Sequence, residues 1–430
     1  MKYSGIEWIG EIPDNWGLRK VKQCFYISKE QAHDSNPTVL SLARAGVKIR
    51  DISNNEGQLA ASYDNYNPVQ PGDLLLNPMD LYSGANCSLS DVSGVISPAY
   101  VNLRKYVELN PKFFDYFFKT QYWTMAMFAH GKGVSFDNRW TMNAEAVLNY
   151  YLPFPSYEEQ NRIVEKINQK TDEIDSLIEI ENQQIEKLKE YKQAVITEAV
   201  TKGLDKNVAM KDSGVEWISK IPVGWSIQKV LNQLSMSVTD GPHTTPELQP
   251  EGVAFVSAEA VSCGNGVIDF SHIRGYISEE FYQECCLKYI PEIDDVYMIK
   301  SGATTGRVSI VTTLEPKFTI WSPLAVMRCD KNKMIPKFLY YAVQCEHFQR
   351  QVSLGWSFGT QQNLGMRTLE QLKLIIPTLL EQREIADYLD IKTGDIEKII
   401  ELKNKKIDRL GEYKKSLIYE YVTGKKEVTA

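Results

Sequence analysis

The sequence predicts a mixed α/β protein in which two similar globular domains are separated by two long helices that form an antiparallel coiled coil. Three observations predict this fold. Blocks of sequence recur in the same order in both halves, each interior carries short strand patterns bounded by turn residues, and each half ends in a long stretch with coiled-coil spacing. Such a repeat implies an internal pseudo-twofold axis.

The repeat is clearest at the two ends of each half. Ser4–Trp16 recurs 209 residues later as Ser213–Trp225, and Pro155–Ile178 recurs 222 residues later as Pro377–Ile400. Additional residues therefore lie inside the second copy, between these blocks. Because the ends of the two halves match and their interiors differ, the sequence favours one fold that performs the same function twice, on two different targets.

Within each interior, short apolar runs are separated by turn residues, which is the pattern of strands. The blocks SPAYVNLR (Ser97–Arg104) and SPLAVMR (Ser322–Arg328) are the clearest match between the interiors. An aromatic-rich helix is predicted to follow each of them, beginning at Pro111 and at Pro336, because proline suits a first helical turn. The predicted order is domain 1 at residues 1–155, helix 1 at 156–205, domain 2 at 206–377 and helix 2 at 378–430.

Both predicted long helices carry one apolar stripe. Glu158 to Thr201 contains neither proline nor glycine and would form a helix of roughly 66 Å at 1.5 Å per residue. Apolar residues recur at spacings of four and seven, so the two stripes can pack against each other. The predicted core of the helix pair contains Ile167, Ile174, Ile178, Ile185, Leu188, Val195, Leu389, Ile396, Ile400, Ile407, Leu410 and Leu417.

Glu181 and Lys403 occupy equivalent polar gaps in the two stripes. One hypothesis is that they meet near the middle of the helix pair and fix its register. The alternative is that both are solvent-exposed charges with no structural role.

Composition excludes several classes of protein. The 430 residues suffice for two or three domains, and 43% hydrophobic with 24% charged residues is typical of a folded globular protein. The first residues carry no secretion signal, and no apolar stretch approaches the ~20 residues of a membrane-spanning helix. Seven cysteines, without a CxxC pair, are interpreted as reduced thiols. We therefore expect a cytoplasmic protein without a membrane segment or a bound metal.

The net charge of −7 argues against nucleic-acid binding only if it is spread evenly. It is not, because residues 156–205 hold 12 acidic and 7 basic side chains. The remaining segments are close to neutral. A local basic face on either globular domain is therefore compatible with the composition.

The ordered series of motifs resembles the specificity subunits of type I restriction-modification systems, and the resemblance covers essentially the whole chain. The first half diverges in one place, where LYSGANCSLSD (Leu81–Asp91) stands in place of a glycine-flanked turn. The motifs that carry the resemblance are the two EW pairs (Glu7, Trp8; Glu216, Trp217), the two EQ pairs (Glu159, Gln160; Glu381, Gln382), TDGPHTTP (Thr239–Pro246) and KSGATTGRVSIV (Lys300–Val311).

This resemblance implies a DNA-binding subunit without catalytic activity. Each globular domain would be a target recognition domain that reads one part of a bipartite site in double-stranded DNA, and the helix pair would set the unread gap between the parts. The helices would also dock two modification subunits, which transfer methyl groups from S-adenosylmethionine to adenine. With restriction subunits, the complex would translocate and cut DNA using ATP and Mg²⁺. None of these cofactors would be bound by this chain.

Motifs for catalysis by the chain itself are missing from the sequence. NPMD (Asn77–Asp80) lacks the second proline and the aromatic residue with which adenine methyltransferases hold the flipped base. SGATTGR (Ser301–Arg307) ends in arginine where a phosphate-binding loop has lysine followed by serine or threonine. The five histidines are scattered. We therefore expect no catalytic residues and no enzymatic activity.

The candidate DNA-binding residues are polar or basic side chains in turn-rich segments, because these groups contact base edges and phosphates. The alternative for each is an ordinary surface residue. Four tryptophans of the repeated frame, Trp8, Trp16, Trp217 and Trp225, are assigned to packing. The candidates are Arg44, Lys48, Arg50, Asn86, Lys132, Asn138, Arg139, His243, Thr244, Thr245, Thr304, Thr305, Arg307, Gln361, Gln362 and Asn363.

Two other functions fit the same pattern. A stand-alone DNA-binding regulator with a coiled-coil dimerisation helix would bind a specific sequence without partners. A coiled-coil scaffold would bind no nucleic acid, which the nearly neutral domains permit.

Overall fold

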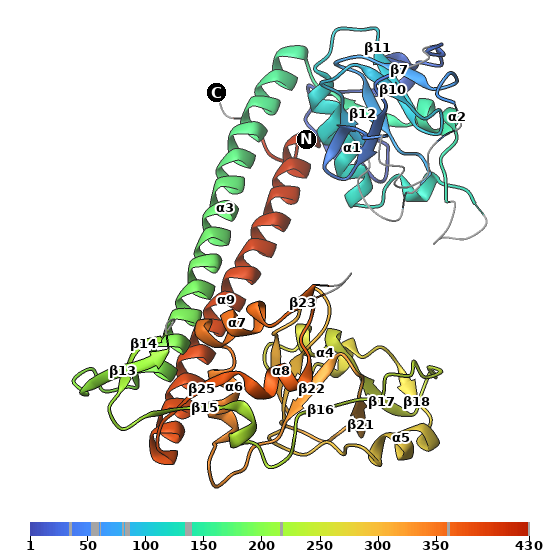
Figure 1. The fold of residues 1–430 in the computed structure, drawn as a ribbon. Helices are drawn as coiled ribbons and strands as arrows, with labels where there is room; N and C mark the ends of the chain where they lie inside the picture. Colours follow the sequence, from blue (N-terminus) through green and yellow to red (C-terminus); the bar gives the residue numbers. More distant parts are fainter. Residues whose placement is uncertain are drawn as a thin grey trace. The chain divides into compact units, whose positions relative to one another are not determined.

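The computed structural model describes residues 1–33, 37–52, 60, 62–79, 81, 87–133, 140–215, 218–358 and 362–428. It divides into two compact units (Figure 1). Unit 1 consists of Met1–Glu181 and Asn404–Ala430, and unit 2 consists of Asn182–Lys403. Each unit contains small sheets, short helices and parts of the two long helices α3 (Tyr157–Lys202) and α9 (Leu379–Val422), so the predicted mixed α/β class is confirmed.

Unit 1 is built around a four-stranded antiparallel sheet in the order β4-β11-β8-β9, and the four phenylalanines of α1 are buried in its core. The strands of unit 1 are β1 (Lys2–Tyr3), β2 (Glu11–Ile12), β3 (Gly17–Lys20), β4 (Phe25–Ile27), β5 (Leu40–Ala43), β6 (Gly46–Ile49), β7 (Asn67–Val69), β8 (Leu74–Leu76), β9 (Cys87–Leu89), β10 (Gly94–Ile96), β11 (Val101–Lys105) and β12 (Tyr151–Phe154). Its short helices are α1 (Pro111–Trp123), α2 (Ala144–Asn149) and the 3-10 turns η1 (Val21–Gln23) and η2 (Phe128–His130).

Unit 2 contains a four-stranded antiparallel sheet in the order β16-β22-β19-β20 and a three-stranded sheet, β18-β17-β21, whose β17 and β21 run parallel. Its strands are β13 (Met210–Val215), β14 (Ile218–Pro222), β15 (Ser226–Lys229), β16 (Thr239–Asp240), β17 (Val253–Val256), β18 (Tyr276–Ile277), β19 (Val296–Ile299), β20 (Val308–Ile310), β21 (Phe318–Ile320), β22 (Leu324–Met327), β23 (Ser357–Phe358), β24 (Gln362–Asn363) and β25 (Lys373–Ile376). Its short helices are α4 (Ala258–Cys263), α5 (Glu279–Cys286), α6 (Pro336–Ala342), α7 (Glu346–Leu354), α8 (Met366–Gln371), η3 (Val230–Gln233) and η4 (Phe270–His272).

The repeated EQ motif holds the first turn of each long helix against its unit. In unit 1, the Trp16 indole donates to Glu159 at 2.8 Å, and Gln160 accepts from the backbone N–H of Asn110 at 2.8 Å, just before α1. In unit 2, Trp225 donates to Glu381 at 3.0 Å. The equivalent Gln382 accepts from the backbone N–H of Ile335 at 2.9 Å, just before α6. Both glutamines are fully buried, so the motif joins a long helix to a short one.

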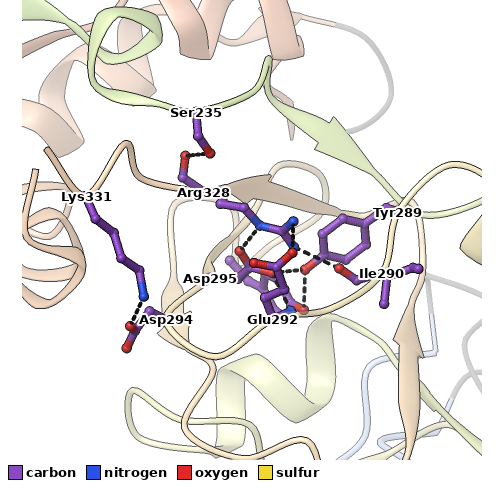
Figure 2. Close-up of polar contacts among 9 residues, drawn as sticks. Ser235, Tyr289, Ile290, Glu292, Asp294, Asp295, Arg328 and Lys331 are labelled. Carbon is purple, nitrogen blue, oxygen red and sulfur yellow. Dashed lines mark hydrogen bonds and ion pairs between the residues drawn. The ribbon is translucent and has the colours of Figure 1, made fainter. Parts of the chain in front are cut away.

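A second repeated contact lies in the four-stranded sheets. Arg104, in β11, makes two hydrogen bonds with the buried Asp73, each of 2.9 Å. Arg328, after β22, makes the same pair with the buried Asp295, at 2.7 and 2.8 Å (Figure 2). These arginines are the last residues of the two blocks SPAYVNLR and SPLAVMR, and in each unit the aspartate directly precedes a central strand. The hydrogen bonds to the aspartates raise the pKa of both arginines above the usual value.

Within unit 1, the start of α3 packs antiparallel to the end of α9. Ile163 and Ile167 lie in one core cluster with Leu417 and Ile418. Lys414 donates to Asp175 at 2.6 Å, and Lys406 forms an ion pair of 2.6 Å with the buried Glu181.

Within unit 2, the end of α3 packs antiparallel to the start of α9. Ile196 and Val200 share a core cluster with Ile385 and Leu389, and Lys192 forms an ion pair with Glu397. All twelve residues that the sequence assigns to the helix-pair core are buried or half-buried.

The predicted pair of Glu181 and Lys403 would join the two units, because Glu181 belongs to unit 1 and Lys403 to unit 2. It therefore stays a prediction. Within its own unit, Lys403 donates to Gln184.

Candidate nucleic-acid interface

The turn between β19 and β20 in unit 2 presents three of the candidate residues. Gly302 and Gly306 adopt φ angles of +101° and +92°, which residues other than glycine rarely adopt. A Cβ at Gly306 would lie 2.4 Å from Oε1 of Gln349, so the side chain of Gln349 would have to shift to accommodate it. Thr304 and Thr305 are half-buried. Arg307 is exposed and donates to the backbone carbonyl of Ser262 at 3.2 Å.

A second segment lies beside this turn. The N–H of Leu364 donates to the carbonyl of Lys300 at 2.7 Å, and the N–H of Gly302 donates to the carbonyl of Gln362 at 3.1 Å. Ser301 and Asn363 form a β-bridge. Gln362 and Asn363 are exposed and therefore lie next to the turn, whereas the candidate Gln361 is outside the described residues.

The third segment is the loop that follows β16. Asp240 is 0% exposed and forms ion pairs with Lys288 and with Nζ of Lys300 at 3.2 Å, and Nε2 of His243 lies 3.2 Å from the same carboxylate. Burial alone would raise the pKa of Asp240, but Lys288 and Lys300 more than offset this, so the pKa lies below its usual value. The carboxylate is therefore ionised at neutral pH.

The exposed residues His243, Thr244 and Thr245 follow directly after this carboxylate. Glycine is needed at position 241, because a Cβ there would lie 2.0 Å from the backbone carbonyl oxygen of Ile320. The structure thus brings together candidates from three separate segments of unit 2, through Lys300. Sequence reasoning did not select Asp240, Lys288 or Lys300. The motifs TDGPHTTP and KSGATTGR contain two of these residues, and no sequence signal points to Lys288.

In unit 1, three basic candidates lie on a single hairpin. Strands β5 and β6 pair antiparallel with Ala43 opposite Gly46, which places Arg44 in the two-residue turn. Lys48 lies on the returning strand β6, and Arg50 comes directly after it. Arg44 and Lys48 are exposed and Arg50 is half-buried, so the hairpin carries a cluster of positive charge.

The other unit 1 candidates are not drawn together in the same way. Lys132 is exposed and forms a β-bridge with Thr141. Asn86, Asn138 and Arg139 lie outside the described residues, as does Trp217 of the repeated frame.

The remaining tryptophans of the frame are in packed positions. Trp16 and Trp225 are each 2% exposed, and Trp8 is half-buried, 4.4 Å from the ring of His130 and 5.5 Å from that of Tyr150. The indoles of Trp16 and Trp225 are therefore not available for stacking on bases, and that of Trp8 packs against neighbouring rings.

A polar cleft of about 380 Å³ lies in unit 2 between the end of α3 and the turn that carries Arg307. Lys192, Gln193, Gln344 and Gln349 also line it. The part of the chain that the structure describes holds no group of three or more metal-ligating side chains. None of its helices is long and apolar enough to cross a membrane.

Comparisons with known proteins agree with one another. The family model of the type I restriction modification DNA specificity domain matches residues 253–412. The putative type I restriction enzyme MjaX specificity subunit of Methanocaldococcus jannaschii is 25% identical over 67% of this chain, which spans 62% of that protein. The MjaVIII specificity subunit of the same organism is 22% identical over 93% of this chain and 85% of its own length.

Among solved structures, one chain from a study of complex assembly and conformational transition of the type I R-M system matches with a TM-score of 0.67. It is 16% identical, and the match covers 96% of this chain and 98% of that one. This similarity concerns the fold.

Proposed function

We propose that this chain, which is similar to type I restriction-modification specificity subunits, selects the DNA sequence for such an enzyme without catalysing a reaction itself. Each unit would read one part of a bipartite site in double-stranded DNA. The observation that carries the proposal is the convergence of three polar segments of unit 2 on Lys300. A surface assembled from separate loops is typical of a site that binds a partner.

The exposed side chains have the chemistry that DNA recognition needs. Arg307, Gln362 and Asn363 can make paired hydrogen bonds with base edges, and the threonines can bind bases or phosphates. Arg44 and Lys48 on the unit 1 hairpin supply positive charge for phosphates, despite the acidic net charge of the chain.

The long helices would act as a spacer between the two reading units. α3 has 46 residues and α9 has 44, so each is ~65–70 Å long at 1.5 Å per residue. That is about the length of 20 base pairs of B-DNA at 3.4 Å each. The matching Trp–Glu, Gln and Arg–Asp contacts within the two units support the proposed internal repeat.

The same helices would dock two modification subunits. α3 exposes the apolar residues Leu177, Ile180 and Tyr191, and α9 exposes Ile399, Leu402 and Tyr413. Each residue of the second set lies 222 positions after its counterpart in the first. Two equivalent apolar surfaces suit two copies of one partner.

In the assembled enzyme, S-adenosylmethionine would belong to the modification subunits, and ATP and Mg²⁺ to the restriction subunits. This chain would contribute binding of DNA and of partners, in the cytoplasm.

Adenine-methylation mapping tests this function. DNA from cells that express the chain with its modification subunit should carry a bipartite methylated motif that is missing when the chain is missing. Exchange of residues 28–150 for those of a relative should change one part of the motif and leave the other intact. Methylation independent of this chain would refute the proposal, and a DNA-binding assay would then distinguish a regulator from a scaffold.

Docking is tested separately by binding of the modification subunit to the purified chain. Ile180→Glu and Leu402→Glu place a charge in the two equivalent surfaces and should each weaken binding at least tenfold. Leu380→Glu is the matched control, because Leu380 is at least as exposed as Ile180 and Leu402 but its counterpart at the 222-residue offset is Glu158. Equal effects of all three substitutions would exclude these surfaces.

A further inference from the structure

The buried carboxylate of Asp240 connects the candidate recognition segments of unit 2. It lies at the end of β16 and is 0% exposed, yet it is surrounded by Lys288, Lys300 and His243. A buried carboxylate is costly unless it is paired, so these contacts are required for Asp240 to remain charged where it is. The contact to His243 comes from the same loop, and the two lysines come from residues about fifty and sixty positions later in the chain.

Lys300 is the residue through which the three segments meet. Its side chain is 11% exposed and reaches Asp240, below the loop that carries His243, Thr244 and Thr245. Its carbonyl accepts the N–H of Leu364, which follows Gln362 and Asn363. Lys300 is also the first residue after β19, at the start of the turn that carries Thr304, Thr305 and Arg307.

From this arrangement we infer that Asp240 and Lys300 are positioning residues for DNA recognition by unit 2. They hold the loop after β16, the β19–β20 turn and the Gln362–Asn363 segment in one fixed arrangement before DNA arrives. This inference rests on the proposed function and adds residues that do not need to touch DNA themselves. A preformed surface binds its target better because less ordering entropy is lost on binding.

The consequence of removing the carboxylate follows from burial. Lys288 is 45% exposed and can turn into water when Asp240 becomes neutral. Lys300 lacks this route to water, because its side chain is only 11% exposed, and its ammonium group would lose its counter-charge in place. Asp240→Asn should therefore displace Lys300 and, with it, both the turn and the segment bonded to its carbonyl.

The first measurement is hydrogen exchange of the full-length chain without DNA. Asp240→Asn and the milder Lys300→Gln should each speed the exchange of residues 300–307 and 362–366 at least tenfold, while strands β19 and β22 keep their protection. Asp269→Asn is the matched control, because Asp269 also contacts a histidine three residues later, at 2.7 Å, but is solvent-accessible. Unchanged exchange in both variants would overturn the inference, whatever the chain binds.

The second measurement is the affinity of the same proteins for duplexes that carry the methylated motif or a scrambled version of either part. Asp240→Asn and Lys300→Gln should reduce discrimination of the part read by unit 2 at least tenfold. Discrimination of the other part should change less than twofold.

These two measurements separate the possible failures. Faster exchange with unaltered discrimination would overturn the positioning role. Loss of protection throughout unit 2 in both variants would show that the residues support the fold as a whole, which also overturns it. A wild-type chain that does not discriminate between the duplexes would refute the proposed function, and the exchange data would still decide whether Asp240 and Lys300 hold the segments.

Discussion

At the scale of single residues, each arginine and aspartate pair is a charged contact with two hydrogen bonds, a geometry that is stronger than a neutral hydrogen bond. Arg328 also contacts Glu292 and the carbonyl of Ile290, while Tyr289 donates to Asp295 (Figure 2). Burial, together with Tyr297 and Asp295, raises the pKa of Tyr289, which therefore remains a neutral donor. Such a network fixes the ends of the two inner strands, β19 and β22, because each polar group in it is hydrogen-bonded to another.

Removing Arg328 should therefore destabilise the chain strongly. We expect Arg328→Met to reduce the free energy of unfolding by about 3–5 kcal/mol, because Asp295 would be left buried without its counter-charge. Lys331→Met is the control, since Lys331 pairs with Asp294 at the surface and its loss should cost at most about 1 kcal/mol. Urea denaturation of the purified proteins measures both, and equal midpoints would contradict the prediction.

Glu381 gives the stability of the chain a pH dependence. Burial raises its pKa, but the hydrogen bonds from Trp225 and Thr378 outweigh this and bring the pKa below the usual 4.5. Because the folded pKa is the lower one, this contribution to stability is present above about pH 4.5 and is lost as the pH falls through the folded pKa.

We therefore expect Glu381→Gln to unfold more easily at pH 7 and to lose less stability than the wild type between pH 5 and pH 3. Thermal melting across that range measures the difference. The exposed Glu384, in the same helical turn, serves as the control as Glu384→Gln. Parallel pH profiles of wild type and Glu381→Gln would contradict the assignment.

At the scale of elements, the long helices leave the clearest local signal in the sequence. The stretch from Glu158 to Thr201 differs by one residue at each end from α3 (Tyr157–Lys202), because an uninterrupted apolar stripe depends only on local spacing. Proline also marks the first residue of α1 and of α6 as predicted.

Contacts between distant residues could not be predicted in this way. The parallel pairing of β17 with β21 joins residues more than sixty positions apart in the sequence, and Lys288 contacts Asp240 across 48 positions. Neither leaves a periodic signal. For the same reason the sequence indicated individual polar residues of the candidate site, such as Thr304 and Gln362, but not the buried charges beneath them.

The apolar stripe of α9 makes a testable contribution to stability. Ile396 is 5% exposed, so Ile396→Ala should cost about 2–5 kcal/mol through lost burial and the cavity that remains. Ile391, on the same helix, is 66% exposed, and Ile391→Ala should change stability by no more than about 0.5 kcal/mol. Chemical denaturation compares the two variants. Similar losses for both would mean that the stripe does not carry the packing of α9.

At the scale of the whole molecule, two units with separate cores should bind DNA independently. Lys48 lies in unit 1 and Arg307 in unit 2. We expect the losses of binding free energy in Lys48→Ala and Arg307→Ala to add in the double variant within about 0.5 kcal/mol. A double-mutant cycle with the cognate duplex measures this. A coupling energy above about 1 kcal/mol would show that one unit senses the other.

The composition of unit 1 also has a consequence for biosynthesis. Unit 2 is one continuous stretch, whereas unit 1 needs Asn404 onwards to complete its core, where Leu417, Ile418 and Tyr421 pack with Ile163 and Ile167. During translation, all residues of unit 2 (182–403) have therefore been synthesised before unit 1 receives the C-terminal residues that complete its core. The nascent protein must keep the apolar residues of early α3 soluble for the time needed to translate more than two hundred further residues. Premature termination after Lys403 would release a finished unit 2 joined to an open and aggregation-prone unit 1.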